Sequence, residues 1–167
     1  KLREYEQRTG IKALDILDVH FYPQGEGAGL GTGGATDAVT AARRIRSTRS
    51  LWDGTYTDES WINERIQLLP LLRRWVAENY PGLGISIGEW DFGAEGHMSG
   101  GLATAEALGR FGVEGVTSAF RWGSPAENTP TFWAFRAYRN FDGVDGRFQD
   151  WSIPVVPVDG TLASLFA

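Results

Sequence analysis

The stretch Leu83-Gly84-Ile85-Ser86-Ile87-Gly88-Glu89-Trp90-Asp91-Phe92 decides how this chain of 167 residues should fold. It is a short, largely apolar run that follows a turn, which predicts a strand buried in the sheet of an α/β protein. Glu89 stands out because it places a carboxylate near the C-terminal end of that strand. Two interpretations are open: a functional acid, or a structural ion pair with a buried cation such as Arg121.

Strand and helix patterns alternate on both sides of this stretch. Residues 13–22 and 116–122 predict two further strands, and in the first of them Asp18, His20 and Tyr22 share one face. Helices are predicted over 2–8, 58–80 with a kink at Pro70, 101–111 and 129–139. The alternation predicts an α/β fold with a parallel sheet. Three βα units do not close an eight-stranded barrel, but they match the last third of one.

Near the C-terminus of the sequence, the alternation of predicted strands and helices gives way to short extended runs. Short extended runs over residues 152–158 and 161–166 are separated by Asp159-Gly160, a pair typical of a tight hairpin turn. We therefore predict a partial (β/α)8 TIM barrel over residues 1–147 and the start of a C-terminal β module over residues 148–167.

Composition argues against several functional classes. The net charge of −5 argues against a nucleic acid as the main partner. We interpret the cluster of Arg43, Arg44, Arg46 and Arg49 as a solvated or carboxylate-paired helix face rather than a phosphate site. The chain has no cysteine, and no run of about 18 apolar residues predicts a membrane span. Its 7 Trp, 5 Tyr and 9 Phe suit stacking on sugar rings, although most aromatic side chains are core.

Two further motifs favour no chemistry of their own. Residues 29–34 satisfy G-x-G-x-x-G, but the glycines are too many and Pro23 separates them from the strand, so a dinucleotide site is a weak alternative. His97 lies in a predicted loop, and with 2 histidines in the chain no zinc-binding spacing exists. We interpret His97 as a surface loop residue.

Several ordered blocks of sequence form a set that covers nearly the whole chain. They are Asp18-Val19-His20-Phe21-Tyr22-Pro23-Gln24, Arg46-Ser47-Thr48-Arg49-Ser50-Leu51-Trp52-Asp53, Asp58-Glu59-Ser60-Trp61-Ile62, the segment from Gly115-Val116 to Arg121-Trp122, and Ala137-Tyr138-Arg139-Asn140-Phe141-Asp142-Gly143. Together these blocks resemble glycoside hydrolase family 44. The resemblance implies a (β/α)8 barrel followed by a β-sandwich module, and cleavage of β-1,4-glucans and xyloglucan with retention of configuration.

By this resemblance the chain begins before the sixth barrel strand and stops inside the sandwich. The expected partners are the missing N-terminal half of the barrel and a polysaccharide substrate, β-glucan or xyloglucan, with no nucleic acid and no membrane. The family also implies a secreted bacterial enzyme, although no signal peptide is visible in this chain. No cofactor is expected. Family members can carry structural metal ions, but no residue in this sequence locates one.

The resemblance assigns the catalytic nucleophile to Glu89. The family's nucleophile lies on the seventh strand in a pattern like I-T-E-Y-N-W-G, and residues 87–93 match it at the glutamate. The sequence departs from that pattern at Gly88, Trp90, Asp91 and Phe92. A retaining mechanism needs a second carboxyl group about 5 Å away as the acid/base. By the resemblance, that residue belongs to the fourth strand, outside this chain.

Six residues are candidates for substrate binding: His20, Tyr22, Trp52, Trp90, Asp91 and Trp122. His20 either forms a structural hydrogen bond or positions the substrate or the nucleophile. Trp52 and Trp122 are either core residues or sugar platforms. Asp91 would orient the substrate or a neighbour. We predict that His20, Tyr22, Glu89, Asp91 and Trp122 surround one concave mouth. The competing hypothesis is a non-catalytic carbohydrate-binding module that uses aromatic platforms.

Overall fold

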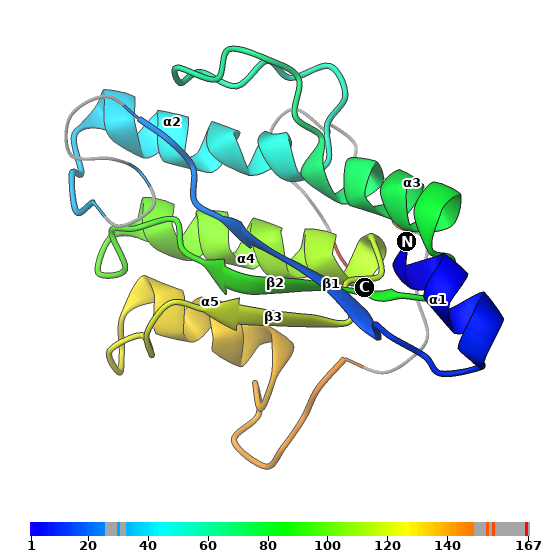
Figure 1. Cartoon of the computed structure of the whole chain (residues 1–167). Helices are drawn as coiled ribbons and strands as arrows, with labels where there is room; N and C mark the ends of the chain where they lie inside the picture. Colours follow the sequence, from blue (N-terminus) through cyan, green and yellow to red (C-terminus); the bar gives the residue numbers. More distant parts are fainter. Residues whose placement is uncertain (26–29, 31–32, 149–152, 154, 156–165, 167) are drawn as a thin grey trace.

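A parallel sheet of three strands lies at the centre of the fold. The computed structural model describes residues 1–25, 30, 33–148, 153, 155 and 166. Its strands are β1 (Ile16–Phe21), β2 (Gly84–Trp90) and β3 (Ser118–Arg121), side by side in that order (Figure 1). Both neighbouring pairs are parallel. The predicted α/β fold with a parallel sheet is therefore confirmed, and each strand lies inside its predicted range.

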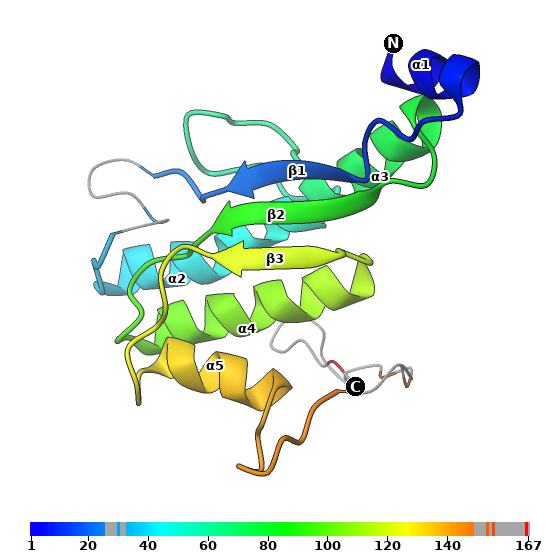
Figure 2. The same ribbon diagram turned by 60° about the horizontal axis from the view of Figure 1, so that its bottom comes forward.

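Helices pack against one face of this sheet. The described helices are α1 (Leu2–Thr9), α2 (Ala38–Ser47), the short 3₁₀ helix η1 (Thr48–Leu51), α3 (Leu68–Asn79), α4 (Met98–Val113) and α5 (Pro130–Tyr138). Figure 2 shows α2, α4 and α5 below the sheet, and no described helix covers its upper face. α1 lies beyond the N-terminal end of β1, beside α3 (Figures 1 and 2), and none of its residues is buried. One face of the sheet is therefore bare in the described part of the chain.

The hydrophobic core lies between the sheet and the helices. Leu72, Ile87, Trp90 and Phe92 are completely buried in it. The Trp90 ring packs edge-on against Phe111, with the ring centroids 5.2 Å apart. Burying a large apolar side chain stabilises a fold by roughly 1.5–3 kcal/mol, so this layer is the main source of stability.

Local sequence signals set several helix ends as predicted. Gly10 ends α1 with a φ of 72°, a left-handed conformation that glycine adopts without strain. Thr129 begins α5, because its Oγ1 accepts a hydrogen bond from Phe132 N at 3.2 Å, and Pro130 occupies the first turn. α4 extends beyond its predicted range at both ends, so Gly112 lies inside the helix instead of stopping it.

The helix predicted over residues 58–80 is wrong in its first half. The helical spacing of apolar residues is present there, but Asn63 and Gln67 have positive φ values of 47° and 38°, which interrupt a helix. The Asp58 carboxylate accepts a hydrogen bond from Ser60 N at 3.0 Å, a local bond that competes with helix formation. α3 therefore begins only after Gln67.

The kink predicted at Pro70 rests on that longer helix and is also wrong. Pro70 lies in the first turn of α3. Backbone N–H groups in this turn have no acceptor within the helix, so the missing N–H of proline costs no helical hydrogen bond there. Leu69 and Leu72 on either side of it are buried. Pro70 therefore helps to start the helix.

The C-terminal β module predicted over residues 148–167 falls almost entirely outside the described residues, as does its hairpin at Asp159-Gly160. It stays a prediction. In the ranges that the structure does describe, no helix is both long enough and apolar enough to cross a membrane.

Candidate active site

A β-bulge sets the direction of the Glu89 side chain. β1 and β2 pair in step as far as Val19 and Ile87, and the next pair is His20 with Glu89, so Gly88 is an extra residue in β2. The pairing of β2 with β3 shifts over the same segment. Strict alternation would place Glu89 on the buried face with Ile87, whereas the bulge turns it to the bare face.

The Glu89 carboxylate contacts two side chains at the end of β1. Tyr22 donates a hydrogen bond to Glu89 Oε2 at 3.1 Å, and His20 Nδ1 lies 3.3 Å from the same oxygen. Both contacts are with Oε2, and Oε1 has no polar partner among the residues that the structure describes. The Glu89 side chain is 33% exposed. One carboxylate oxygen is thus held by two side chains, while the other has no partner among the described residues.

The hydroxyl of Tyr22 is held in its protonated form. Burial raises the pKa of Tyr22, and the hydrogen bond to Glu89 and the negative charges of Glu89 and Asp91 raise it further. Tyr22 is therefore a neutral hydrogen-bond donor to Glu89 at any pH near neutrality.

Asp91 is nearly buried and pairs with Arg121. Arg121 Nη2 lies 3.1 Å from Asp91 Oδ2 and 3.3 Å from Glu95 Oε2. Asp91 Oδ1 also accepts a hydrogen bond from Gly93 N at 2.9 Å. The structural alternative for Glu89, an ion pair with Arg121, is wrong, because the guanidinium is turned to Asp91 and Glu95.

Two aromatic side chains are exposed on β3 and at its end. Phe120 and Trp122 are 60% and 58% exposed. The Trp122 backbone is fixed to β2, because its N–H donates to the carbonyl oxygen of Trp90 at 2.9 Å. An exposed ring on a rigid strand end suits stacking against a sugar.

Comparisons with known proteins point to one family. No protein-family model matches the chain. Endoglucanase A of Paenibacillus lautus is 35% identical over 173 residues, which cover 100% of this chain and 25% of that protein. Cel44A, a family 44 endoglucanase of Clostridium thermocellum, has a TM-score of 0.88 at 35% identity, covering 99% of this chain and 34% of that one. A Paenibacillus polymyxa xyloglucanase of family 44, solved with xyloglucan, has a TM-score of 0.80 at 32% identity, covering 92% of this chain and 31% of that one.

These solved structures agree with the chain in both sequence and backbone. The chain belongs to glycoside hydrolase family 44. The resemblance read from its sequence blocks is thereby confirmed. The chain spans between 25% and 34% of the length of these relatives.

Two tryptophans predicted to bind substrate do not lie on the face of Glu89. Trp90 is completely buried, because the bulge that exposes Glu89 turns the next side chain toward the helices. Trp52 packs against the same core, and the Arg110 guanidinium covers its ring at 3.7 Å from the centroid. Both rings therefore serve packing in this family 44 chain, and the core interpretation of Trp52 is the one that the structure supports.

Of the five residues predicted to surround one concave mouth, three have side chains in direct contact and two do not. His20, Tyr22 and Glu89 are in direct contact. Asp91 lies close enough for its charge to act on Tyr22, but its carboxylate is occupied by Arg121. Trp122 is linked to the group through its backbone: its N–H donates to the carbonyl oxygen of Trp90, and its carbonyl oxygen accepts from Arg121, the partner of Asp91. The direct cluster is thus smaller than predicted.

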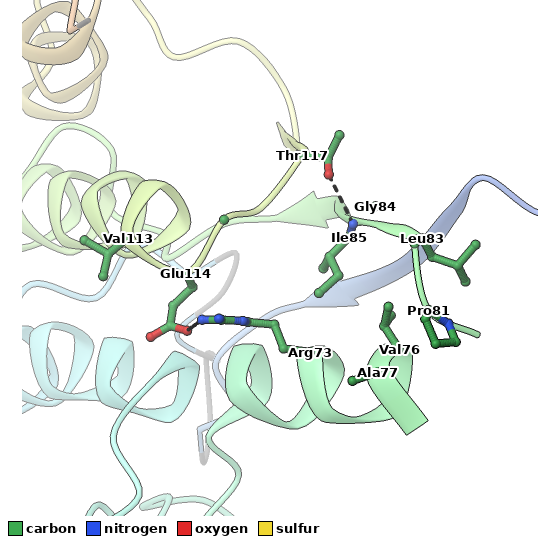
Figure 3. A pocket seen from close by; sticks show the side chains of 12 residues that line it. Arg73, Val76, Ala77, Pro81, Leu83, Gly84, Ile85, Val113, Glu114 and Thr117 are labelled. Atoms are coloured by element: carbon green, nitrogen blue, oxygen red, sulfur yellow. Dashed lines mark hydrogen bonds and ion pairs between the residues drawn. The ribbon is translucent and has the colours of Figure 1, made fainter. Parts of the chain in front are cut away.

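A pocket of about 500 Å³ lies at the opposite end of β2 (Figure 3). Gly84 and Ile85 line it at the start of the strand, and the ion pair between Arg73 and Glu114 crosses it with an N–O distance of 3.0 Å. The pocket lies at the N-terminal end of β2, whereas Glu89 lies near the C-terminal end. This pocket is therefore separate from the Glu89 cluster.

The interpretation of the arginine cluster is right for two members and wrong for a third. Arg46 pairs with Glu59 at 2.8 Å and Arg49 pairs with Asp53 at 2.7 Å, as predicted for a carboxylate-paired face. Arg44, on the same helix as Arg46, is completely buried. Its place in the core is a feature that sequence reasoning missed.

Arg44 connects three segments below the Glu89 cluster. Its guanidinium donates to the carbonyl oxygen of Phe92 at 2.8 Å, to Ser99 Oγ at 2.8 Å and to the carbonyl oxygen of Ala35 at 2.9 Å. Two of these partners are backbone atoms, so no acidic residue in the sequence marks Arg44 as buried. It fixes the chain just beyond the end of β2.

His97 caps α4. Its Nδ1 accepts a hydrogen bond from Ser99 N at 3.2 Å, which satisfies an amide in the first turn of the helix. Among the residues that the structure describes, no group of three or more His, Asp or Glu side chains could hold a metal ion. The role of His97 is thus structural.

Proposed function

We propose that Glu89 is the nucleophile of a retaining glycoside hydrolase that cleaves β-1,4-linked glucans, including xyloglucan. The observation that carries the proposal is that the described residues contact one of the two oxygens of its carboxylate. Tyr22 and His20 hold Oε2, while Oε1 has no partner among the described residues. A positioned carboxylate with one free oxygen is what attack on an anomeric carbon requires.

The proposed reaction has two displacement steps. Attack by Glu89 Oε1 forms a bond to the anomeric carbon as the glycosidic bond breaks, and the leaving oxygen takes a proton from a second carboxyl group. Water then attacks the same carbon, gives its proton to that second group and releases the Glu89 carboxylate. The second carboxyl would come from a part of the protein outside these 167 residues.

The bare sheet face supports a place for this chain within a (β/α)8 barrel. The described helices cover one face, as they do around a barrel wall, and the Glu89 cluster lies at the C-terminal strand ends on the other face. We propose that β1, β2 and β3 are barrel strands six to eight. The β-sandwich module would follow after residue 147.

The substrate proposal rests on chemistry and on relatives. Exposed Phe120 and Trp122 offer apolar faces to sugar rings. The relatives with shared family and fold are named endoglucanase and xyloglucanase. A polymeric glucan does not enter a bacterial cell, so we propose that the complete protein acts outside it.

The test uses the complete protein with Glu89→Gln and, as a matched control, Glu114→Gln at the far end of the sheet. We expect Glu89→Gln to abolish hydrolysis of xyloglucan and carboxymethylcellulose, and Glu114→Gln to retain it. An activated 2-deoxy-2-fluoro cello-oligosaccharide should label Glu89 covalently, as read by peptide mass spectrometry.

Undiminished turnover by Glu89→Gln, or labelling of another residue, would rule out the nucleophile assignment. A complete protein that binds xyloglucan but breaks no bond would favour the carbohydrate-binding module instead. Circular dichroism of each variant shows whether it is folded.

A further inference from the structure

Asp18 of β1 lies beside the Glu89 cluster, and the proposed reaction leaves it without a role. Its Oδ2 is 4.0 Å from His20 Nε2, while the other ring nitrogen of His20 faces Glu89 Oε2 at 3.3 Å. The imidazole thus lies between two carboxylates on the bare face of the sheet. At 4.0 Å the contact with Asp18 is an ion-pair distance, longer than a hydrogen bond.

Gly88 provides the space that the Asp18 carboxylate occupies. A Cβ atom at Gly88 would lie 2.3 Å from Asp18 Oδ2 and 2.7 Å from Oδ1, which is closer than atoms can pack. Gly88 is not among the glycines with positive φ, so its backbone does not demand glycine. The absence of a side chain at Gly88 therefore leaves room for the Asp18 carboxylate in its present position.

We propose that Asp18 is a positioning residue that acts on Glu89 through His20. The proposal rests on the nucleophilic role of Glu89. When the His20 ring is protonated, the negative carboxylate of Glu89 attracts it before attack. Once Glu89 is esterified it carries no charge, and the charge of Asp18 is what keeps the ring in place until water attacks.

This argument assigns Asp18 to the second step of the reaction. The charged and titratable groups that the structure places around His20 are Asp18, Glu89 and, through the shared Oε2 atom, Tyr22. Loss of the Asp18 charge should therefore slow hydrolysis of the glycosyl ester and leave its formation nearly unchanged. A purely structural role would impair both steps.

The test uses Asp18→Asn in the complete enzyme, with an aryl β-cellobioside whose good leaving group makes ester hydrolysis rate-limiting. We expect kcat to fall about three- to tenfold and KM to fall in proportion, so that kcat/KM is unchanged. Gly88→Ala, whose Cβ displaces the carboxylate, should show the same pattern. Asp15→Asn, which removes a charge paired with Lys12 at the other end of β1, should change neither constant.

A double-mutant cycle tests the path through His20. In a His20→Asn background, Asp18→Asn should have no further effect. The proposal is overturned if Asp18→Asn lowers kcat/KM as much as kcat, if it leaves kcat unchanged, if it acts fully without His20, or if Gly88→Ala has wild-type kinetics. Covalent labelling of Glu89 in the same preparations separates this failure from failure of the nucleophile assignment.

Discussion

Tyr22 holds one oxygen of the proposed nucleophile Glu89 and leaves the other without a partner among the described residues. Its raised pKa keeps the proton on the phenol, so the bond to Glu89 Oε2 has one direction. A hydrogen bond to a charged group contributes about 1.5–3 kcal/mol. Tyr22→Phe should therefore lower kcat/KM of the complete enzyme about ten- to a hundredfold, as measured by steady-state kinetics on xyloglucan.

The control for Tyr22→Phe is Tyr80→Phe, because the Tyr80 hydroxyl bonds Glu6 of α1, far from β2's C-terminal end. That variant should keep wild-type activity. Equal kinetics for Tyr22→Phe and wild type would show that the bond to Glu89 has no role in catalysis.

The candidate site illustrates which residues a sequence can reveal. Glu89, His20 and Tyr22 could be predicted, because their positions at strand ends follow from alternation in β1 and from the family pattern in β2. The burial of Trp90 could not be predicted, because a bulge shifts the faces of the strand without a distinctive residue pattern. The burial of Arg44 could not be predicted for a different reason, because two of its hydrogen-bond acceptors are backbone carbonyl oxygens.

At the level of elements, Arg44 joins α2 to the end of β2 and the start of α4. Replacing it with methionine would leave the buried carbonyl oxygen of Phe92 and the partly buried carbonyl oxygen of Ala35 without this donor. An unsatisfied buried polar group costs about 1–3 kcal/mol, so we expect a clear fall in the Tm of the complete protein, followed by differential scanning calorimetry. Arg46→Met breaks a half-exposed ion pair with Glu59 and should lower Tm much less. Similar losses in both variants would contradict the structural role of Arg44.

The element boundaries show the limit of periodicity as evidence. The three strands and the start of α5 could be predicted, because alternation and the Thr129-Pro130 capping pair act locally. Residues 58–67 have helical spacing but no helix, because Asp58 and Ser60 hydrogen-bond within the turn and Asn63 takes a left-handed conformation. Local side-chain bonds outweigh spacing there.

At the level of the whole molecule, several carboxylates link stability to pH. Hydrogen bonds from Arg46 lower the pKa of Glu59, and backbone N–H groups of Thr40 and Val144 lower those of Asp37 and Asp142. Between the folded and unfolded pKa values the unfolded chain binds more protons, so falling pH favours unfolding. The stabilisation that these carboxylates contribute is fully present above about pH 5. It is lost as pH falls through their pKa values in the folded protein, which are lower than those in the unfolded chain.

We therefore expect the Tm of the complete protein to decline below about pH 5. Glu59→Gln should make this decline shallower, because it removes one of the linked groups. An identical pH dependence of Tm in Glu59→Gln and wild type would contradict the contribution of the Arg46–Glu59 pair.

The bare face of the sheet leads to a prediction for the 167-residue chain on its own. Ile16 and Phe120 are exposed on that face, and the outer edges of β1 and β3 have no strand neighbour among the described residues. We expect this chain alone to associate in solution and to hydrolyse xyloglucan negligibly, because positioned proton transfer is typically worth about 10²- to 10⁴-fold. Light scattering and reducing-sugar assays measure both. A monomeric chain with full activity would contradict the proposed need for a second carboxyl from elsewhere.

The extra residue in β2 also bears on how the length of this strand can vary. Without Gly88, the pairing of His20 with Glu89 and of Phe21 with Trp90 would follow directly from the pairing of Val19 with Ile87, with no shift in register. Removing that residue would therefore leave the apolar and polar sides as they are, whereas removing a residue from the regularly paired segment would exchange them. The strand thus has one point, next to the Glu89 carboxylate, where a residue can be removed without turning that carboxylate to the other side of the sheet.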